Sequence, residues 1–523
     1  MDRKVLYPID RASFRGIRQE GFLYVDKTAY IDTLVRNKGK YYFLARPRRF
    51  GKSLFLDTLA EFFSGNRALF KGLAIDTLQP QEWETYPVLR FNLSGKSYLD
   101  KYDLKNKLNL QLELLEKEFN INQSIDSLDV EERFLKLITN IKDKTCKDVV
   151  ILIDEYDAPL SSSIDNHELQ KIFREQLHGF YSLLKGAENM IRFCMLTGVT
   201  RYGKVSVFSG LNNLKDITFS DEFAAVCGIT KNELALNYQD GIEALALKKG
   251  ITIDETFELL KFHYDGYHFS ESMVDIYNPF SINNAFYENA IDDYWCQSGT
   301  PTLLAKSLMK NDYDIASLNG RQVEEKALTD LSMEAIKPIP LFYQTGYLTL
   351  KAYDPKRGRF TIGYPNREVE AGILNNVLSV YLPDNDDQQG YVYDMEDFLE
   401  AGNPEAFIKT LKSFLSGIPS RLHAIVDRYE NYYHTIFYCL ASLLGLDVHA
   451  EYATSEGSID ILVKTESFIY IIELKVNGTA EDAIRQIEQK HYSSPFEADG
   501  RRVFKIGLGF SKESATIESA IIL

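Results

Sequence analysis

Two carboxylates and a lysine near the C-terminus have the residue types and spacing of a metal-dependent hydrolytic site. Asp460 opens a short apolar segment, and Glu473 and Lys475 lie in a second one, residues 468–476. Residues two apart in a strand share a face, so Glu473 and Lys475 should point the same way. Paired carboxylates suit Mg²⁺, which prefers oxygen ligands and bridges to phosphates. The pattern predicts phosphodiester hydrolysis in which Asp460 and Glu473 hold Mg²⁺ and Lys475 orients the attacking water.

Further polar residues are expected beside this pair. A helix over residues 479–492 carries Gln486 and ends at Tyr492, and an upstream helix carries Glu430. A Glu-x-Lys spacing on a strand is common by chance, so these neighbours strengthen the prediction. We expect Gln486, Glu430 and Tyr492 to position the substrate strand, with Gln486 and Glu430 also candidates for holding a second metal ion.

These residues together resemble the PD-(D/E)XK nuclease superfamily in its RecB-like form. The resemblance rests on Asp460, Glu473, Lys475, Gln486, Tyr492 and, at the place of the helix-borne acid, Glu430. The proline of the family motif is absent, because Ile459 precedes Asp460. The resemblance implies a restriction-endonuclease-like α/β domain, which we place at residues 401–523.

A second chemical site is expected near the N-terminus, where an apolar segment, residues 41–45, runs into the sequence RPRRFGKS, residues 46–53. In a P-loop, backbone N–H groups and a helix N-terminus cradle phosphates, the lysine reaches the β- and γ-phosphates, and the serine holds Mg²⁺. Gly51, Lys52 and Ser53 match this pattern. The segment therefore predicts ATP binding.

The arginines of this loop are unusual. Arg46 stands where a P-loop has its first glycine, and Pro47 after it favours an extended backbone at Arg46. We expect Arg49 and the neighbouring arginines either to add charge to the phosphate cradle or to face a partner chain.

A lone Gly-Lys-Ser is weak evidence, and two later segments complete the pattern. Residues 149–153 are all apolar, as in a strand buried on both faces, and they end in Asp154 and Glu155. A third apolar segment, residues 191–196, ends at Thr197. We expect Asp154 to order the Mg²⁺ shell, Glu155 to polarise the attacking water, and Thr197 to sense the γ-phosphate.

Several sequence segments resemble those of one bacterial family, AAA-ATPase-like proteins fused to a C-terminal PD-(D/E)XK nuclease domain. The segments are YVDKT (24–28), RPRRFGKS (46–53), LIDEYD (152–157), FSGLNNL (208–214), YDGY (264–267), YNPF (277–280) and QTGY (344–347). The resemblance covers nearly the whole chain. It implies an ATPase coupled to a nuclease, of a kind suspected in defence or mobile-element control. It also implies a homo-oligomer with an arginine acting in trans, for which Arg174 and Arg201 are candidates.

The predicted fold class is α/β multidomain. Its parts are a P-loop ATPase core with a parallel sheet (1–227), a helical lid (228–332), a winged-helix-like segment and linker (333–400) and the nuclease domain (401–523). The winged-helix expectation rests on two alternating segments around a Pro- and Gly-containing turn, residues 346–364. Such a hairpin either contacts DNA or serves as a packing module.

Composition limits the alternatives. The 523 residues carry a net charge of −16, which argues against a general nucleic-acid coat. Residues 403–523 hold 12 Lys and Arg against 16 Asp and Glu, a net charge of −4. Bound Mg²⁺ would invert the local sign, so nucleic acid, DNA rather than RNA, remains the expected partner. Five widely spaced cysteines indicate neither a zinc site nor a disulfide framework. The sequence lacks an apolar run long enough to predict a signal peptide or a membrane span, so we expect a cytoplasmic protein.

One alternative function is a nucleotide-dependent switch or scaffold whose nuclease fold only binds nucleic acid or protein. The intact set of Asp460, Glu473 and Lys475 favours the enzyme, because clustered acids without a metal repel one another.

Overall fold

The computed structural model describes most of the chain, which folds as two compact units. The described residues are 5–121, 129–202, 208, 211, 213–296, 308, 313, 315–329, 337–381, 388–416, 432–444, 446–476, 478–511 and 516–523. One unit comprises Met1–Gly299 and Gly320–Glu368, and the other Thr300–Asn319 and Val369–Leu523. The finer boundaries at residues 227, 332 and 400 remain predictions.

The first unit is built on a five-stranded parallel sheet. Its strands are β1 (Tyr41–Ala45), β2 (Val88–Asn92), β3 (Val149–Asp154), β4 (Ile191–Gly198) and β5 (Lys215–Asp216), in the order β2-β3-β4-β1-β5. All residues of β1 and β3 are buried, as expected for strands covered on both faces. This order places β4 between the P-loop strand and β3, so the carboxyl ends of all three strands meet at one edge.

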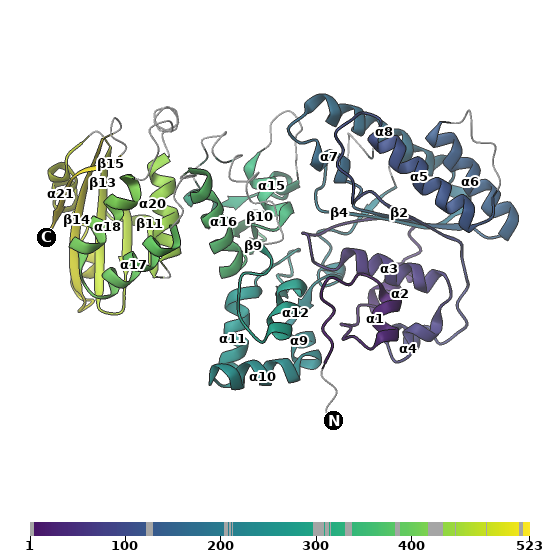
Figure 1. The fold of residues 1–523 in the computed structure, drawn as a ribbon, viewed down its shortest axis with the longest axis horizontal. Helices are drawn as coiled ribbons and strands as arrows, with labels where there is room; N and C mark the ends of the chain where they lie inside the picture. The colour runs from purple at the N-terminus through teal and green to yellow at the C-terminus, as the bar shows by residue number, and fades with distance from the viewer. Residues whose placement is uncertain are drawn as a thin grey trace. The chain divides into compact units, whose positions relative to one another are not determined.

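Helices cover both faces of this sheet (Figure 1). On one face lie α5 (Asp103–Glu118), α6 (Val130–Thr145) and α8 (His167–Gly186), and on the other lies α3 (Lys52–Phe63). The shorter helices of this region are α1 (Phe14–Glu20), α2 (Ala29–Arg36), α4 (Ala74–Leu78) and α7 (Ala158–Ser162). The sandwich of helices around a parallel sheet confirms the predicted α/β core.

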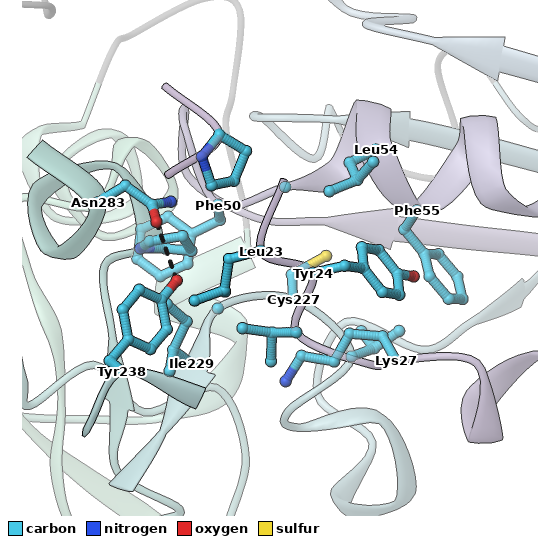
Figure 2. A pocket seen from close by; sticks show the side chains of 16 residues that line it. Leu23, Tyr24, Lys27, Phe50, Leu54, Phe55, Cys227, Ile229, Tyr238 and Asn283 are labelled. Carbon is cyan, nitrogen blue, oxygen red and sulfur yellow. Dashed lines mark hydrogen bonds between the residues drawn. The ribbon is translucent and has the colours of Figure 1, made fainter. Parts of the chain in front are cut away.

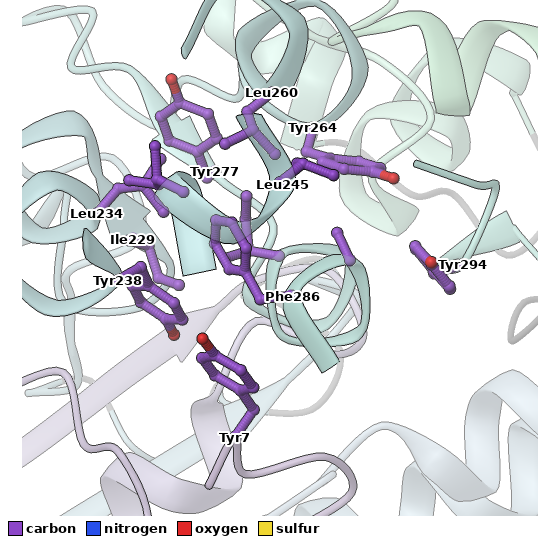
Figure 3. Packing of buried hydrophobic residues seen from close by; sticks show 13 residues of the cluster. Tyr7, Ile229, Leu234, Tyr238, Leu245, Leu260, Tyr264, Tyr277, Phe286 and Tyr294 are labelled. Carbon is purple, nitrogen blue, oxygen red and sulfur yellow. The ribbon is translucent and has the colours of Figure 1, made fainter. Parts of the chain in front are cut away.

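A helical lid follows the sheet, as predicted. It contains α9 (Lys231–Asn237), α10 (Gln239–Lys249), α11 (Ile253–Tyr264), α12 (Pro279–Glu288) and the strand pair β6 (Ile229–Thr230) and β7 (Ile276–Tyr277). Its core includes Tyr238, Leu260 and Phe286, and Tyr7 from the N-terminal segment stacks on Tyr238 with ring centroids 5.9 Å apart (Figure 3). The N-terminus is thus packed into the lid.

The rest of the first unit has the element order of a winged helix. A short strand, β8 (Gln322–Val323), precedes α14 (Glu325–Thr329) and α15 (Pro338–Thr345), and the hairpin of β9 (Thr349–Asp354) and β10 (Arg359–Gly363) follows. The three strands form an antiparallel sheet in the order β8-β10-β9. The hairpin is the one predicted from the sequence.

The second unit holds a five-stranded mixed sheet. Its strands, in spatial and sequence order, are β11 (Asp447–Thr454), β12 (Gly457–Lys464), β13 (Phe468–Val476), β14 (Arg502–Ser511) and β15 (Thr516–Ile522). Only the β13–β14 pair is parallel, and α21 (Ala480–Gln489) connects these two strands. Further helices are α16 (Arg367–Tyr381), most of which belongs to this unit, α17 (Gln388–Glu400), α18 (Pro404–Ser416) and α20 (Tyr432–Leu443).

One sequence-based expectation for this unit is wrong. The end of the segment 333–400 was predicted as a linker, but α17 is helical and packs against α18. Val392, Met395 and Leu399 recur at helical spacing and are buried, which gives the helix one apolar face. None of the described helices is both long and apolar enough to cross a membrane.

Candidate functional site

The P-loop connects β1 to α3, and the side chain of its lysine binds the backbone of the same loop. Gly51 has a φ of 92°, a left-handed conformation that glycine adopts without strain, and it caps the N-terminus of α3. The Lys52 ammonium donates to the carbonyl oxygens of Arg46 and Pro47, both at 2.9 Å. Burial lowers the pKa of Lys52, while the nearby carboxylates, Asp154 first, oppose that shift. Ser53 follows in the first turn of α3.

Arg46 does not lie in a phosphate cradle or on an exposed face, which corrects the expectation for this arginine. Its side chain is 1% exposed, donates to the carbonyl oxygens of Ala45, Thr218 and Phe223, and lies 4.2 Å from the ring centre of Phe269. Burial lowers its pKa. Arg46 therefore anchors the start of the loop to the strand end beside it.

Arg49 points to a carboxylate. Its guanidinium donates to Asp10 at 2.6 Å and lies 4.8 Å from the ring centre of Phe280. With a φ of 67°, Arg49 also has a left-handed backbone, which is uncommon for a residue with a side chain. Arg49 is thus at the P-loop but is paired with the N-terminal segment.

The acidic end of β3 meets the polar end of β4. The Thr197 hydroxyl donates to Asp154 at 2.6 Å, and both side chains are buried. Glu155 follows with a φ of 50°, and burial is the main cause that raises its pKa, with Lys52 opposing. The structure thus brings Lys52, Asp154, Glu155 and Thr197 to one edge of the sheet, where the sequence placed them.

Asp157 holds the loop that follows β4. Its carboxylate accepts the backbone N–H of Thr200 at 2.7 Å, the N–H of Val199 at 3.2 Å, and the Thr200 hydroxyl. The buried Tyr156 hydroxyl donates to the Thr200 carbonyl at 2.8 Å. Asp157 therefore fixes loop geometry, as expected for a structural acid.

The winged-helix segment contacts both loops of this site, a feature that the sequence analysis missed. Gln344 accepts the backbone N–H of Arg201 at 2.6 Å, so α15 is tied to the loop after β4. Gly346, with a φ of 93°, allows a close approach to Pro47, since a Cβ there would lie 2.6 Å from the proline ring. The Trp295 indole N–H donates to the Arg48 carbonyl at 3.1 Å. The QTGY motif was visible in the sequence, but nothing in it named these partners.

Arg201, a candidate for action in trans, is paired within its own chain. Its guanidinium lies 2.8 Å from the carboxylate of Asp216 and 4.0 Å from that of Glu325. Arg174, the other candidate, lies on α8.

A cavity adjoins the P-loop and encloses about 80 Å³ (Figure 2). Three parts of the first unit line it: the N-terminal segment, the start of α3, and the lid. The labelled lining residues include Leu23, Tyr24, Lys27, Phe50, Leu54, Phe55, Cys227, Ile229, Tyr238 and Asn283. Most of the lining is apolar, with a few polar groups at its rim, and the Tyr238 hydroxyl donates to Asn283 at 2.9 Å. Such a lining suits a flat aromatic group next to a phosphate-binding loop.

Lys27 joins this cavity to the lid. Its ammonium donates to both carboxylate oxygens of Glu233 at 2.7 Å and to the Ala225 carbonyl at 2.8 Å. Glu233 also completes the capping box that starts α9. Burial lowers the pKa of Lys27, although Glu233 acts in the opposite direction. All three donors of this lysine are used, so it connects the N-terminal segment to the lid.

In the second unit, β12 and β13 bring the predicted acids together. Asp460 accepts the backbone N–H of Leu474 at 2.7 Å, which holds it against β13. The Lys475 ammonium donates to Oε1 of Glu473 at 3.1 Å, and the Gln486 amide donates to the same oxygen from α21. The structure therefore assembles Asp460, Glu473, Lys475 and Gln486 as one cluster.

Glu473 is the most unusual acid of this cluster. Its side chain is fully buried, and its Oε2 atom makes no hydrogen bond. Burial, helped by the charge of Asp460, raises the pKa of Glu473 to about 7, while Lys475 opposes the shift. A buried carboxylate oxygen without a partner is costly. A cation shared with Asp460 would satisfy it, so these residues fit Mg²⁺.

The described residues contain no cluster of three or more His, Cys, Asp or Glu side chains that could hold a metal ion. This is compatible with Mg²⁺, which keeps several waters and often takes only one or two carboxylates.

Two glycines of β14 explain how α21 reaches this cluster, and the sequence analysis missed them. Gly507 pairs with Glu473 and Gly509 with Lys475 in the parallel ladder. A Cβ on Gly507 would lie 2.5 Å from the Ala480 carbonyl, and one on Gly509 would lie 2.7 Å from the Gly478 carbonyl. The bare strand lets α21 lie close, which places Gln486 beside Glu473. The Gly-Leu-Gly sequence was a usable signal for such an approach.

Two further expected residues, Tyr492 and Glu430, are not among the described members of this cluster. Tyr492 is 2% exposed and packs in an apolar core with Ile459 and Ile487, so it cannot touch a substrate strand in this conformation. The large tyrosine ring buries much apolar area, which suits it to such a core. Glu430 lies outside the described residues.

Comparisons with known proteins agree with this division. A family described as predicted AAA-ATPase matches residues 8–208, and the PD-(D/E)XK nuclease superfamily matches residues 428–520. An uncharacterized protein in the vnfD 5′ region of Azotobacter chroococcum mcd 1 is 34% identical, and the match spans 100% of this chain and 99% of that protein. Among solved structures, the Aeropyrum pernix ORC1 protein in complex with DNA is similar over 68% of this chain and 91% of that chain, with 9% identity and a TM-score of 0.25.

Proposed function

Because the chain belongs to the family of predicted AAA-ATPases that carry a C-terminal PD-(D/E)XK nuclease superfamily domain, we propose that it binds and hydrolyses ATP and cleaves nucleic acid with Mg²⁺. The observation that carries the proposal is the buried Oε2 atom of Glu473, which has no partner and lies in a cluster with Asp460 and Lys475. That arrangement is costly for a scaffold and useful for a metal enzyme.

In the nuclease cluster, each side chain has a separate task. Asp460 and Glu473 would hold Mg²⁺, which when bound activates water and neutralises charge on the phosphate. The Lys475 ammonium, 3.1 Å from Glu473, orients the attacking water and stabilises developing negative charge. Gln486 donates to Oε1 of Glu473, which leaves Oε2 for the cation. Glu430 is proposed to position the substrate from its helix.

In the ATPase cluster, Lys52 and Ser53 are proposed to contact the β- and γ-phosphates and Mg²⁺. Asp154 orders the Mg²⁺ shell, and its bond to Thr197 lets the end of β4 respond to the γ-phosphate. Glu155, whose pKa is raised by burial, is proposed to accept a proton from the attacking water. A phosphate contact from Arg49 requires that it release Asp10.

The cavity beside the P-loop is proposed to take the nucleotide base. It is lined by Phe50 and Gly51 of the loop itself, so a base there would be continuous with phosphates on α3. Tyr24 and Leu23 from the N-terminal segment would cover the ring. Homo-oligomers and a role in defence or mobile-element control remain expectations of the family resemblance, and a cytoplasmic location remains an expectation from the sequence.

The test compares the parent protein with Glu473→Gln, which removes the metal-binding charge but keeps the size of the side chain. With Mg²⁺ or Mn²⁺, the parent should cleave linear or circular duplex DNA, single-stranded DNA or structured RNA. The variant should lose cleavage and retain ATP binding. Undiminished cleavage by Glu473→Gln would refute the assignment. Binding of these nucleic acids by the parent without cleavage under any metal condition would favour the scaffold.

A further inference from the structure

The hairpin of β9 and β10 carries a local excess of positive charge that the proposed function leaves unused. Residues 349–363 contain four cations, Lys351, Lys356, Arg357 and Arg359, and one acid, Asp354, in a chain of net charge −16. The three cations of the tip, Lys356, Arg357 and Arg359, are exposed. A local charge of this sign in an acidic protein calls for a functional explanation.

The only acid of the hairpin is used to shape its turn. The Asp354 carboxylate accepts the backbone N–H of Lys356 at 2.9 Å and that of Arg357 at 3.3 Å, and its carbonyl accepts the N–H of Gly358 at 2.8 Å. Gly358 supplies the left-handed conformation, with a φ of 62°. Asp354 thus forms an Asx-type turn that fixes the tip. The tip is therefore preorganised, with its cations held on a short, rigid loop.

The cations of the tip remain available to a ligand. Within the described part of the chain, Lys356 and Arg359 form no ion pair, and Arg357 has only an exposed contact of 3.3 Å with Asp354. Glu271 and Glu325 lie near Tyr353, which pairs with Phe360 next to the turn, and raise its pKa, Glu271 most strongly. Glu325 also lies 4.0 Å from Arg201. These acids thus lie close to the turn but form no ion pair with Lys356 or Arg359 within the described residues.

The inner face of the hairpin is anchored, so the tip cannot fold away. Leu350, Phe360 and Ile362 are buried, and the Tyr353 and Phe360 rings pack with centroids 4.7 Å apart. Phe360 also pairs with Val323 of β8. A supported two-stranded ribbon is narrow enough to approach or enter the major groove of a duplex, which is about 12 Å wide.

The helix that would read bases in a winged helix is not available here. Most of α15 is buried, namely Pro338, Pro340, Leu341, Phe342, Tyr343 and Gln344. Gln344 is bound to Arg201, and Gly346 lies against Pro47 of the P-loop. Any nucleic-acid contact of this module must therefore come from the wing. A contact through lysine and arginine alone binds phosphates without reading the sequence.

We propose that the β9–β10 hairpin binds the phosphate backbone of a nucleic-acid duplex through Lys356, Arg357 and Arg359, independently of base sequence. The proposal deepens the proposed nuclease function by adding a contact in the ATPase unit, far in sequence from Glu473. Three phosphate contacts predict that log K falls with log salt with a slope near −2.7, that is, about a 40-fold loss of affinity between 50 and 200 mM salt.

The experiment measures binding rather than cleavage, so its failure is distinguishable from failure of the nuclease assignment. Full-length Glu473→Gln is titrated against a labelled 20-bp DNA duplex by fluorescence anisotropy at four salt concentrations. The same protein is compared with Lys356→Gln, Arg357→Gln and Arg359→Gln combined. The matched control removes the same charge from exposed lysines elsewhere in this unit, Lys71→Gln, Lys171→Gln and Lys249→Gln.

We expect the hairpin variant to lose at least about tenfold in affinity at 100 mM salt and to reduce the salt slope by about 2 to 3, while the control changes neither. A scrambled duplex should bind equally well, and an RNA duplex of the same sequence identifies which backbone is preferred. No duplex binding by the starting protein, or equal affinity and slope for the hairpin and control variants, would overturn the proposal. The single variant Lys356→Gln, with an expected slope change of about 0.9, keeps the test valid if the triple variant is unstable.

Discussion

The two candidate sites of this protein are assembled in opposite ways. The nuclease cluster comes from two adjacent strands and the next helix, so Asp460, Glu473 and Gln486 lie within one short stretch of sequence. The ATPase cluster joins the ends of β1, β3 and β4 with the lid and the winged-helix segment, and Lys52, Asp154 and Thr197 are far apart along the chain.

The sites also differ in how their polar atoms are satisfied. In the ATPase cluster, Lys52 is bound to two carbonyls, Asp154 to Thr197, and Asp157 to the loop after β4. In the nuclease cluster, Oε2 of Glu473 is buried without a partner. The first arrangement holds together without a ligand, whereas the second leaves one carboxylate oxygen for the proposed cation. We therefore expect the nuclease cluster to be impaired by substitutions close to it. The ATPase cluster should also respond to substitutions in elements distant in sequence.

The largest effects should come from replacing the lysine of each site by alanine. Lys475→Ala should reduce cleavage more than about 100-fold, because even partners of metal ligands are worth 10- to 100-fold, and it should leave ATP hydrolysis intact. Lys52→Ala should weaken ATP binding about 10- to 100-fold through the lost charge-assisted contact with phosphate. Both activities are measured for both variants, with and without ATP.

The same pair of variants tests coupling between the sites. If ATP gates the nuclease, Lys52→Ala should change cleavage although it lies in the other unit, because ATP can shift a conformational equilibrium only by its differential affinity for two states. Cleavage by Lys52→Ala that equals the parent in ATP on every substrate would mean that the two activities are fused but independent.

A smaller effect is expected from Gly507→Ala, which disturbs the nuclease site through packing alone. The new Cβ would meet the Ala480 carbonyl at 2.5 Å and the Ile484 side chain at 2.8 Å, so α21 must move and take Gln486 with it. We expect a loss of about 1–3 kcal/mol in stability and roughly a tenfold drop in cleavage. Thermal unfolding and cleavage rates are compared with Gly186→Ala, where a Cβ meets nothing within 4 Å. Equal behaviour of the two variants would contradict the close approach of α21.

Gln344→Leu tests whether the ATPase site depends on a distant element. The substitution removes the acceptor of the Arg201 N–H, which now lies at 2.6 Å, and leaves that group unpaired beside the loop after β4. We expect kcat for ATP hydrolysis to fall several-fold with little change in KM, because an unpaired, partly buried donor costs up to about 1–3 kcal/mol and displaces the loop rather than the nucleotide. Gln344→Glu, which keeps the acceptor, should retain more activity. A change in KM alone would assign Gln344 to binding.

The last prediction compares two glutamates with fully buried side chains, Glu473 and Glu368. Glu473 has one oxygen without a partner, whereas Glu368 accepts from the Ser281 hydroxyl at 2.8 Å and from the Trp295 N–H at 2.5 Å. Burial raises the pKa of Glu368 to about 8. Between the ordinary glutamate pKa and about 8, the folded state binds more protons than the unfolded state, so stability falls as pH rises through this window.

Glu368→Gln removes that dependence. The free energy of unfolding of the variant minus that of the parent should therefore increase from pH 5 to pH 9, with a slope of at most about 1.4 kcal/mol per pH unit. A difference that is flat in pH would show that Glu368 is ionised in the folded protein throughout this range.

The sequence alone was sufficient where a motif is local or where burial imposes a pattern. Residues 41–45 and 149–153 are continuously apolar, and residues 191–196 are apolar except for Arg192, because strands of a parallel sheet are covered on both faces. Asp460, Glu473 and Lys475 could be grouped because a short hairpin and the two-residue period of a strand fix which side chains meet. The hairpin around Gly358 was visible for the same reason, through its turn residues.

Only the tertiary structure decided the contacts that depend on which surfaces meet. Arg46 looks like a phosphate ligand in the sequence but is buried among carbonyls, and the polar stretch around Met395 is a helix whose one apolar face packs on α18. The tie between Gln344 and Arg201, and the bare face of Gly507 under α21, join residues brought together by packing. Periodicity and motifs record the local backbone and the side that is buried, whereas the identity of the partner depends on the three-dimensional meeting of elements distant in sequence.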